Sequence, residues 1–400
     1  MKRFDSMIFV AIAAIAVMVG CGGNDTYSVK GGSGGSGGSG GGGSSAPWPK
    51  FKHDNQNTGR TAVAAGIAHK SFAITWEFVT GGGIANSAAI GTDGTIYFVS
   101  TDSNVYAVNG ATGAEKWHFA LDRGGNSSPL IGADGTIYVG GGPVLHALSP
   151  TSGAEIWHFD VQSGFGNNII ATPVLTASNV ICLADDRGIA YGVDATTGTQ
   201  IWTFTASSSI EGPMAVAADG TLYFSTGDDT TFNFYALDSA TGAQKWIFNA
   251  DDFMEGGVAI ASDGTIYFGS RNKNLFAVNP NGTMKWTYAL GGTRSTPAIG
   301  ADGTVYAISD TNGSCVALNG ATGAKIWETS IVQDAVGSPA IASDGSLFVG
   351  GDKLYQLNGA TGAQISVFNP GTSFRDASPS IGVDGTIYAG GVNGHMYAVK

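Results

Sequence analysis

The residues best suited to chemistry in this 400-residue chain are polar side chains at a repeated position. The other copies of the repeat have a small or apolar residue there. The polar side chains stand two or three positions before a repeated step of a small residue and Pro. Other copies of the step have Ala, Ile, Val or Gly there. The six residues are Asn86, Asn126, Glu211, Glu255, Arg294 and Asp376. Glu211 and Glu255 come from adjacent repeats, so their carboxylates could hold a cation such as Ca²⁺. The set as a whole could contact a ligand or partner, and the alternative that these are solvated loop charges stays open.

A repeat of about 40 residues must position these side chains. Seven tryptophans mark it, spaced by 41, 40, 45, 44, 40 and 41 residues, and an eighth copy has Ser366 in that place. They are Trp76, Trp117, Trp157, Trp202, Trp246, Trp286 and Trp327. A period of this length with four short strands per unit is typical of β-propeller blades. We expect the tryptophans to be structural and to dock between repeats.

Two turns, most of them with Gly at the second position, recur along the repeats and predict where the strands reverse. Asp-Gly supplies the positive φ of a two-residue hairpin in seven copies, and the third copy has Ser178-Asn179 instead. Thr-Gly or a substitute marks the turn before the Trp strand. Both turns belong to one face, which is nearly uniform and therefore reads as structural. The opposite face has loops that vary between copies, such as residues 161–171 and 249–257.

The number of repeats and the strands at the two ends predict a closed ring. Innermost strands begin near residues 87, 128, 172, 212, 257, 296, 338 and 378. The last repeat has three strands, and its missing outer strand matches residues 74–80 at the other end of the sequence. An unpaired end would expose a strand edge. The sequence thus predicts an all-β, eight-bladed propeller of four-stranded antiparallel blades, closed by pairing of the N- and C-terminal strands.

The repeat resembles the tryptophan-docking motif of pyrroloquinoline-quinone (PQQ)-like propellers, A-x-[DN]-x-x-T-G-x-x-x-W, as in residues 107–117. Such repeats occur in quinone-dependent dehydrogenases and in non-catalytic propellers. The chain lacks the adjacent Cys-Cys pair of those enzymes, and it has no C-x-x-C-H haem motif. The resemblance therefore implies a protein that is not an enzyme and needs no cofactor, with Ca²⁺ as the open exception. A PQQ-dependent dehydrogenase is the less favoured alternative.

The N-terminal residues resemble a bacterial lipoprotein leader. Lys2 and Arg3 precede a short apolar run, and residues 18–21, Met-Val-Gly-Cys, resemble a lipobox in which Cys21 is lipidated. An ordinary secretory signal is the alternative. We divide the chain into a signal peptide (1–20), a flexible Gly/Ser tether (21–46), a lead-in segment that packs Trp48 and Phe51 on the ring (47–73), and the propeller (74–400).

The chain is acidic, with a net charge of −12, and only 12% of its residues are charged. This balance excludes a phosphate-binding nucleic-acid protein and electrostatic docking on anionic lipid. Cys182 and Cys315 fall in blades too far apart for a disulfide, so we expect both to be buried.

Together these patterns predict a lipid-anchored, monomeric propeller of the bacterial cell envelope, held at the outer membrane. Its variable loop face would bind a protein partner. The chain is also distantly similar to the propeller lipoprotein of the outer-membrane β-barrel assembly machinery, although the tether and lead-in depart from that pattern. An assembly factor is therefore the second functional hypothesis.

Overall fold

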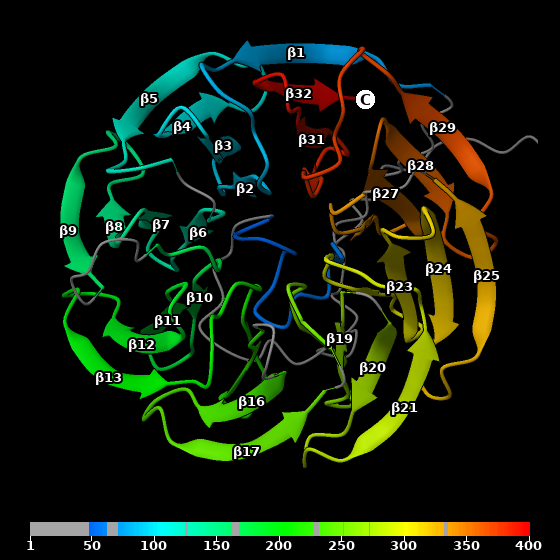
Figure 1. Cartoon of the computed structure of the whole chain (residues 1–400). Helices are drawn as coiled ribbons and strands as arrows, with labels where there is room; N and C mark the ends of the chain where they lie inside the picture. Colours follow the sequence, from blue (N-terminus) through cyan, green and yellow to red (C-terminus); the bar gives the residue numbers. More distant parts are fainter. Residues whose placement is uncertain are drawn as a thin grey trace, which may run out of the picture. The chain divides into compact units, whose positions relative to one another are not determined.

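A computed structural model of the chain describes residues 48–61, 71–124, 127–161, 168–227, 232–250, 252–271, 273–331 and 335–400. The regular structure in these residues consists of strands, arranged as eight four-stranded antiparallel sheets around a central axis (Figure 1). This arrangement confirms the predicted all-β, eight-bladed propeller. The predicted signal peptide, Cys21 and the Gly/Ser tether lie outside the described residues. None of the described segments forms a helix long and apolar enough to cross a membrane.

The blades follow one another along the chain, each from its innermost to its outermost strand. Blade 1 contains β2 (Ala89–Ile90), β3 (Thr95–Ser100), β4 (Asn104–Asn109) and β5 (Glu115–Ala120). Blade 2 contains β6 (Leu130–Ile131), β7 (Ile137–Gly141), β8 (Val144–Leu148) and β9 (Glu155–Asp160). Blade 3 contains β10 (Val174–Leu175), β11 (Val180–Ala184), β12 (Ile189–Asp194) and β13 (Gln200–Thr205). Blade 4 contains β14 (Ala215–Val216), β15 (Thr221–Ser225), β16 (Asn233–Asp238) and β17 (Gln244–Asn249).

The second half of the ring repeats this order. Blade 5 contains β18 (Ala259–Ile260), β19 (Ile266–Gly269), β20 (Asn274–Val278) and β21 (Met284–Ala289). Blade 6 contains β22 (Ala298–Ile299), β23 (Thr304–Ser309), β24 (Ser314–Asn319) and β25 (Lys325–Ser330). Blade 7 contains β26 (Ala340–Ile341), β27 (Ser346–Gly350), β28 (Leu354–Asn358) and β29 (Gln364–Phe368). Blade 8 contains β30 (Ser380–Ile381), β31 (Ile387–Gly390), β32 (His395–Val399) and, from the other end of the chain, β1 (Ile74–Val79).

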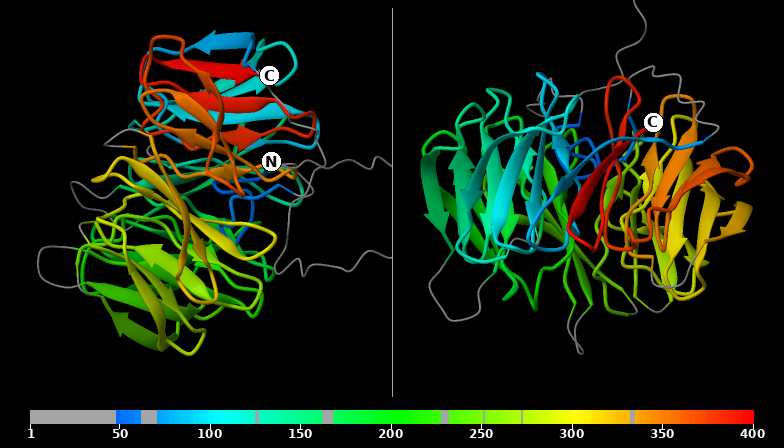
Figure 2. Two further views of the ribbon diagram at one scale, coloured as in Figure 1. Left: turned by 90° about the vertical axis from the view of Figure 1, so that its right-hand side faces the viewer. Right: turned by 90° about the horizontal axis from the view of Figure 1, so that it is seen from above.

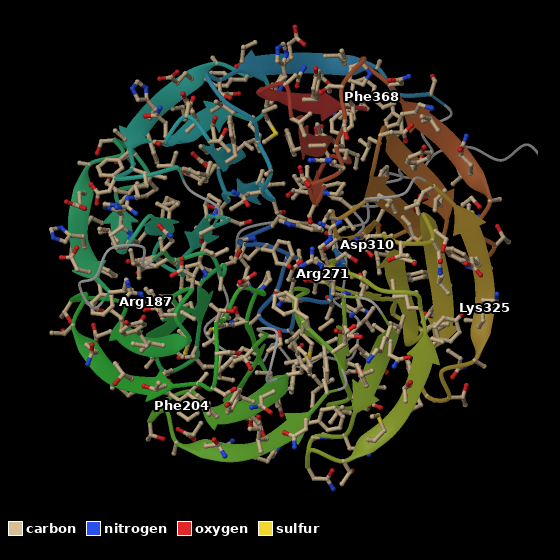
Figure 3. All side chains as sticks on the ribbon, in the orientation of Figure 1. Arg187, Phe204, Arg271, Asp310, Lys325 and Phe368 are labelled. Atoms are coloured by element: carbon tan, nitrogen blue, oxygen red, sulfur yellow. The ribbon has the colours of Figure 1, made fainter. Side chains whose placement is uncertain are left out.

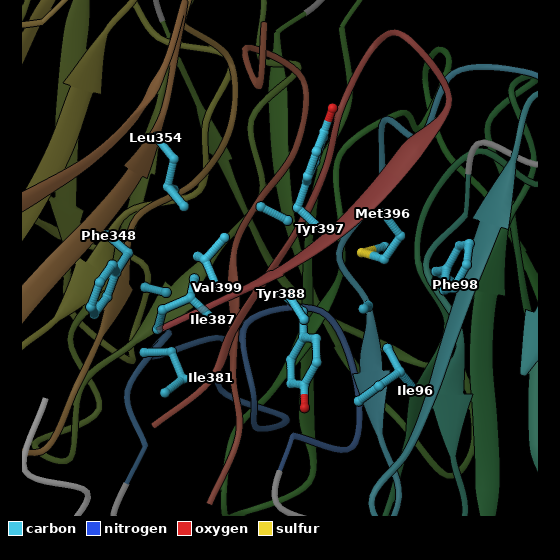
Figure 4. Packing of buried hydrophobic residues seen from close by; sticks show 14 of the residues in the cluster. Ile96, Phe98, Phe348, Leu354, Ile381, Ile387, Tyr388, Met396, Tyr397 and Val399 are labelled. Atoms are coloured by element: carbon cyan, nitrogen blue, oxygen red, sulfur yellow. The ribbon is translucent and has the colours of Figure 1, made fainter. Parts of the chain in front are cut away.

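Blade 8 closes the ring as predicted. Strand β1 pairs antiparallel with β32, and Glu77 lies opposite Tyr397. On its two sides the blade packs against Phe348 and Leu354 of blade 7 and against Ile96 and Phe98 of blade 1 (Figure 4). The middle strands of every blade are buried on both faces because each sheet is covered by two neighbours.

The tryptophans join consecutive blades. The indole Nε1 of Trp202 donates to the carbonyl oxygen of Ser239 in the next blade at 3.0 Å. Its ring lies against Gly242, where an added Cβ would come within 2.7 Å of the indole. Five further indoles donate in the same way, namely Trp76, Trp117, Trp246, Trp286 and Trp327. The Gly of each following turn has the positive φ that the turn requires. Because it has no side chain, the indole ring can also pack directly on its backbone.

Residues 48–61 cross the axis of the propeller, and we call them the axial strap (Figure 1, blue). Its backbone carbonyls accept hydrogen bonds from the second residue of the innermost strand in six blades. The donors are the amides of Ile90, Ile131, Val216, Ile260, Ile299 and Ile341, at 2.7–2.9 Å. The Asn55 side chain reaches a seventh blade at the Leu175 carbonyl oxygen. These bonds satisfy inner strand edges that would otherwise face the axis unpaired.

Strap side chains fill the axis behind this backbone. Trp48 is 1% exposed and Phe51 is 8% exposed. Lys50, Lys52 and Asn57 are also buried. Asn57 donates to the carbonyl oxygens of Met214 and Val258, both at 2.9 Å, and Lys50 Nζ donates to Asn57 Oδ1 at 2.7 Å. The strap therefore occupies the axis at the end of the inner strands that lies next to the Asp-Gly turns.

Candidate functional site on the loop face

The blade-connecting loops place Glu211 and Glu255 at the loop-face end of two adjacent blades, just before β14 and β18. The two carboxylates interact. Burial raises the pKa of Glu211, and the neighbouring Glu255 raises it further. Asp186 adds to this effect, while Arg271 opposes it. We call Asp186, Glu211, Glu255 and Arg271 the mouth cluster.

Arg271 neutralises one of the two glutamates. Its Nη1 donates to Glu255 Oε1 at 2.8 Å, and its guanidinium lies 5.8 Å from the centre of the Phe253 ring. Both side chains of the ion pair are partly open to solvent, with 48% and 22% of their surface exposed. Figure 3 shows Arg271 close to the axis. The cluster thus combines a paired charge, an aromatic face and a half-buried carboxylate.

Arg294 contacts a different partner. Its Nε donates to Asp310 Oδ2 at 2.7 Å, and the Asp310 side chain is only 7% exposed. Asp310 also lies near the axis in Figure 3. This pair joins the loop before β22 to the turn after β23, both in blade 6.

Asp376 and Asn86 belong to other blade connections than the mouth cluster. Asp376 accepts a hydrogen bond from its own neighbour Arg375 at 3.2 Å. Asn86 is half-buried beside blade 1, and Asn126 lies outside the described residues. Of the six predicted residues, Glu211 and Glu255 belong to the mouth cluster, whereas Arg294 and Asp376 have other partners.

Sequence reasoning missed Arg271, Asp310 and the part played by Asp186. All three lie in the turns between the second and third strands of their blades, which open on the same face as the blade-connecting loops. Their position in turns of the loop face could have indicated these residues. Their residue types and spacing could not.

The mouth cluster does not present a formed cation site. Among the described residues, no three His, Cys, Asp or Glu side chains are arranged to hold a metal ion. The expected use of Glu211 and Glu255 for Ca²⁺ stays a prediction, and Arg271 would have to leave Glu255 for it.

The turn face also has hollows. A groove of about 620 Å³ between blades 1 and 2 is lined by Asp93, Tyr97, Lys116 and Asp134. Another of about 640 Å³ between blades 6 and 7 includes Arg60 of the strap. The carboxylate of Asp93 is already engaged by Thr95 and by Lys116 at 2.9 Å, and these contacts hold its pKa at about 2. The grooves thus repeat between blades and are lined by the residues that build the turns.

The fold and its repeated tryptophan docking define an eight-bladed propeller of PQQ-like repeats. A family model described as "Outer membrane protein assembly factor BamB" matches residues 55–144, 140–309 and 233–400. The chain belongs to this family. No curated protein sequence matches it.

Solved structures share the fold at low sequence identity. The quinohemoprotein alcohol dehydrogenase from Comamonas testosteroni has a TM-score of 0.75 and 16% identity over 88% of this chain and 80% of its own. BamB from Moraxella catarrhalis has a TM-score of 0.68 and 18% identity, covering 82% of this chain and 99% of its own. A europium-containing methanol dehydrogenase has a TM-score of 0.73 and 13% identity over 88% and 98%. At these identities the likeness shows the fold alone.

Proposed function

We propose that the protein is a non-enzymatic scaffold of the bacterial cell envelope, anchored to the outer membrane by a lipid on Cys21, that binds a protein partner with its loop face. The proposal rests on one difference between the two faces. The turn face repeats the same residues in each blade, whereas the charged residues around the axis on the loop face differ from blade to blade. In the mouth cluster, Arg271 is half-exposed over Phe253. Arginine and aromatic residues often contribute most of the binding energy at protein interfaces. Membership of the BamB family supports a role beside the assembly machinery of outer-membrane proteins.

Crosslinking in cells tests this proposal. A photoreactive residue placed at Phe253 or Arg271 should trap the same neighbouring protein, and Arg271→Ala with Glu255→Ala should reduce its yield severalfold. The matched control is a photoreactive residue at Lys116 on the turn face, which should not trap that protein. If the loop-face positions yield no specific product in cells whose turn-face variant is equally abundant, the loop-face proposal is wrong.

Quinone-dependent dehydrogenase chemistry is less well supported by the residues at the axis. The strap side chains Lys50, Lys52 and Asn57 fill one end of the axis, and Arg271 holds one of the two carboxylates at the other. These residues do not fit a quinone with its metal ion. We expect the melting temperature of the purified protein in Ca²⁺ to stay unchanged when PQQ is added, and a saturable rise with PQQ would support the enzyme instead.

A further inference from the structure

The junction between blades 7 and 8 lacks side chains that join other blades. At four junctions a tryptophan packs beside a tyrosine of its own blade, and both side chains donate to one carbonyl oxygen of the following blade. In blade 6 the rings of Trp327 and Tyr306 lie 5.8 Å apart, and both side chains donate to Gly359. The strand registers show that blade 7 has Ser366 in place of the tryptophan and Phe348 in place of the tyrosine.

Blade 8 differs from the other blades at the matching position. In blade 1 the residue four positions before Trp117 is Gly113, and the Trp76 ring packs on it. In blade 8 the residue four positions before Trp76 is Phe72. The two outer strands have the same register, since both tryptophans pair with an alanine of the third strand next to the same irregularity. A large ring therefore stands where the other blades have a turn glycine.

Phe72 packs on blade 7. Its ring centre lies 6.2 Å from that of Phe348 and 6.1 Å from that of Phe368, with interplanar angles of 62° and 66°. Such edge-to-face pairs are a favourable arrangement of aromatic rings. Phe348 has the position of the tyrosine that contacts the docking tryptophan in other blades, as Tyr306 contacts Trp327. Blade 8 thus supplies, through Phe72, the aromatic ring that blade 7 lacks.

This exchange replaces polar contacts between the blades by apolar ones. A phenylalanine ring has no N–H or O–H group, so Phe72 and Phe348 cannot make the hydrogen bonds of the tryptophan and the tyrosine. Ser366 donates within its own blade, at 2.7 Å. The outer part of the junction therefore relies on aromatic packing, in which Phe368 also contacts Tyr397 of blade 8 at 5.5 Å between ring centres.

We propose that Phe72 is a latch, a releasable contact that holds the outer strand of blade 8 against blade 7, and that opening of the ring begins with its release. Strand β1 is held on both sides. Phe72 packs on blade 7, and Trp76 Nε1 donates to the Gly110 carbonyl oxygen of blade 1 at 2.8 Å. Phe72 is partly exposed and precedes β1 in the chain. Its release therefore frees this side of β1 before the strand separates from β32.

The place of Phe72 just outside a strand is what makes the contact releasable. Each docking tryptophan lies within an outer strand. Trp202, for example, is the third residue of β13, so it cannot leave Gly242 without disrupting that strand. Phe72 is separated from β1 by Ala73 alone. It can leave blade 7 while the strands of blade 8 stay paired, so the latch responds to whatever displaces the segment between the strap and β1.

Thiol labelling of the full chain tests the inference. Ser366→Cys places a reporter thiol at a side chain that is 7% exposed, and the buried Cys182 and Cys315 report opening in blades 3 and 6. Adding Phe72→Ala should make the reporter react with iodoacetamide at least tenfold faster, while Cys182 and Cys315 keep their rates. Phe72→Leu, which retains apolar volume, should give a smaller increase at the reporter alone. Mass spectrometry of the peptides follows each thiol separately.

Phe78→Ala is the matched control. It removes the same ring from the other side of β1, where Phe78 packs on Phe98 and Tyr106 of blade 1 at 5.8 Å and 5.3 Å between ring centres. The reporter should stay slow in this variant. The inference is overturned if Phe72→Ala leaves the reporter unchanged, if all three thiols accelerate together in both Phe72 variants, or if Phe78→Ala exposes the reporter equally. These outcomes do not depend on whether the loop face captures a partner.

Discussion

Ala73 and Lys400 exchange two backbone hydrogen bonds, with N–O distances of 2.6 Å and 3.0 Å. They extend the pairing of β1 with β32 to the last residue of the sequence. Blade 8 is therefore built from two chain ends, and it has no turn between its third and fourth strands. Each docking tryptophan packs on that turn of the following blade. Because blade 8 lacks the turn, a tryptophan of blade 7 would have no turn to pack on. Ser366, which replaces the tryptophan there, donates instead to Gln356 Oε1 within its own blade at 2.7 Å.

Removing a docked tryptophan should therefore cost far more than changing its eighth counterpart. Trp202→Ala loses the packing on Gly242 and the bond to Ser239, and we expect the free energy of unfolding to fall by about 3–5 kcal/mol. Ser366→Ala should cost about 1 kcal/mol. Denaturant unfolding of both variants measures the difference, and similar losses would contradict the docking account.

The turn glycines should separate into two classes. Gly113 and Gly303 both have a positive φ, but a Cβ on Gly113 would come within 2.8 Å of the Trp76 ring, whereas a Cβ on Gly303 meets nothing within 4 Å. Gly303→Ala should cost about 1 kcal/mol, the backbone penalty alone. Gly113→Ala should cost clearly more because the indole must also shift. Thermal melts of the two variants decide this, and equal shifts would mean that the ring does not press on the turn.

The strap lysines predict a stability that rises with pH. Burial lowers the pKa of both Lys50 and Lys52 to about 7, against 10.5 for the exposed side chain. Between these values the unfolded chain binds more protons than the folded one, so raising the pH favours folding. We expect the free energy of unfolding to grow from pH 7 to 9.5, by roughly 1 kcal/mol per pH unit for each lysine.

The control for this effect is the Lys50→Met/Lys52→Met variant, whose stability should be nearly flat over the same range. Equilibrium unfolding in urea at several pH values measures both proteins. Parallel curves would show that other groups cause the dependence.

Asn57 should be the strap's most important polar side chain. It donates to the carbonyls of two blades and accepts from Lys50. Its φ is +54°, which Gly adopts without strain, so Asn57→Gly removes the side chain and keeps the backbone. We expect a loss of about 1–3 kcal/mol. Asn55→Ala, at a partly exposed position with one side-chain bond, should cost less, and the reverse order would contradict the assignment.

Much of the fold could be predicted from the sequence because its signals are local and repeated. The Asp-Gly turns and the Trp strands recur with nearly the same sequence in blade after blade, and residues 74–80 match the one strand that the last repeat lacks. Cys182 and Cys315 are buried and unpaired, as expected from their strands, and burial raises the pKa of both thiols.

The strap and the mouth cluster were less accessible because they depend on distant partners. Residues 48–61 pair with strands from nearly the whole chain, and no local pattern encodes that. Lys52 adopts a left-handed φ, which its residue type does not favour.

The strap also decides how the protein carries a mechanical load. Tension applied through the residues before Trp48 reaches the axis before it reaches β1 (Figure 2). The strap is held by hydrogen bonds to seven blades, rather than by the pairing of one rim strand. A propeller pulled from its N-terminus should therefore resist as one body until the strap is drawn out, and only then open at the seam between β1 and β32.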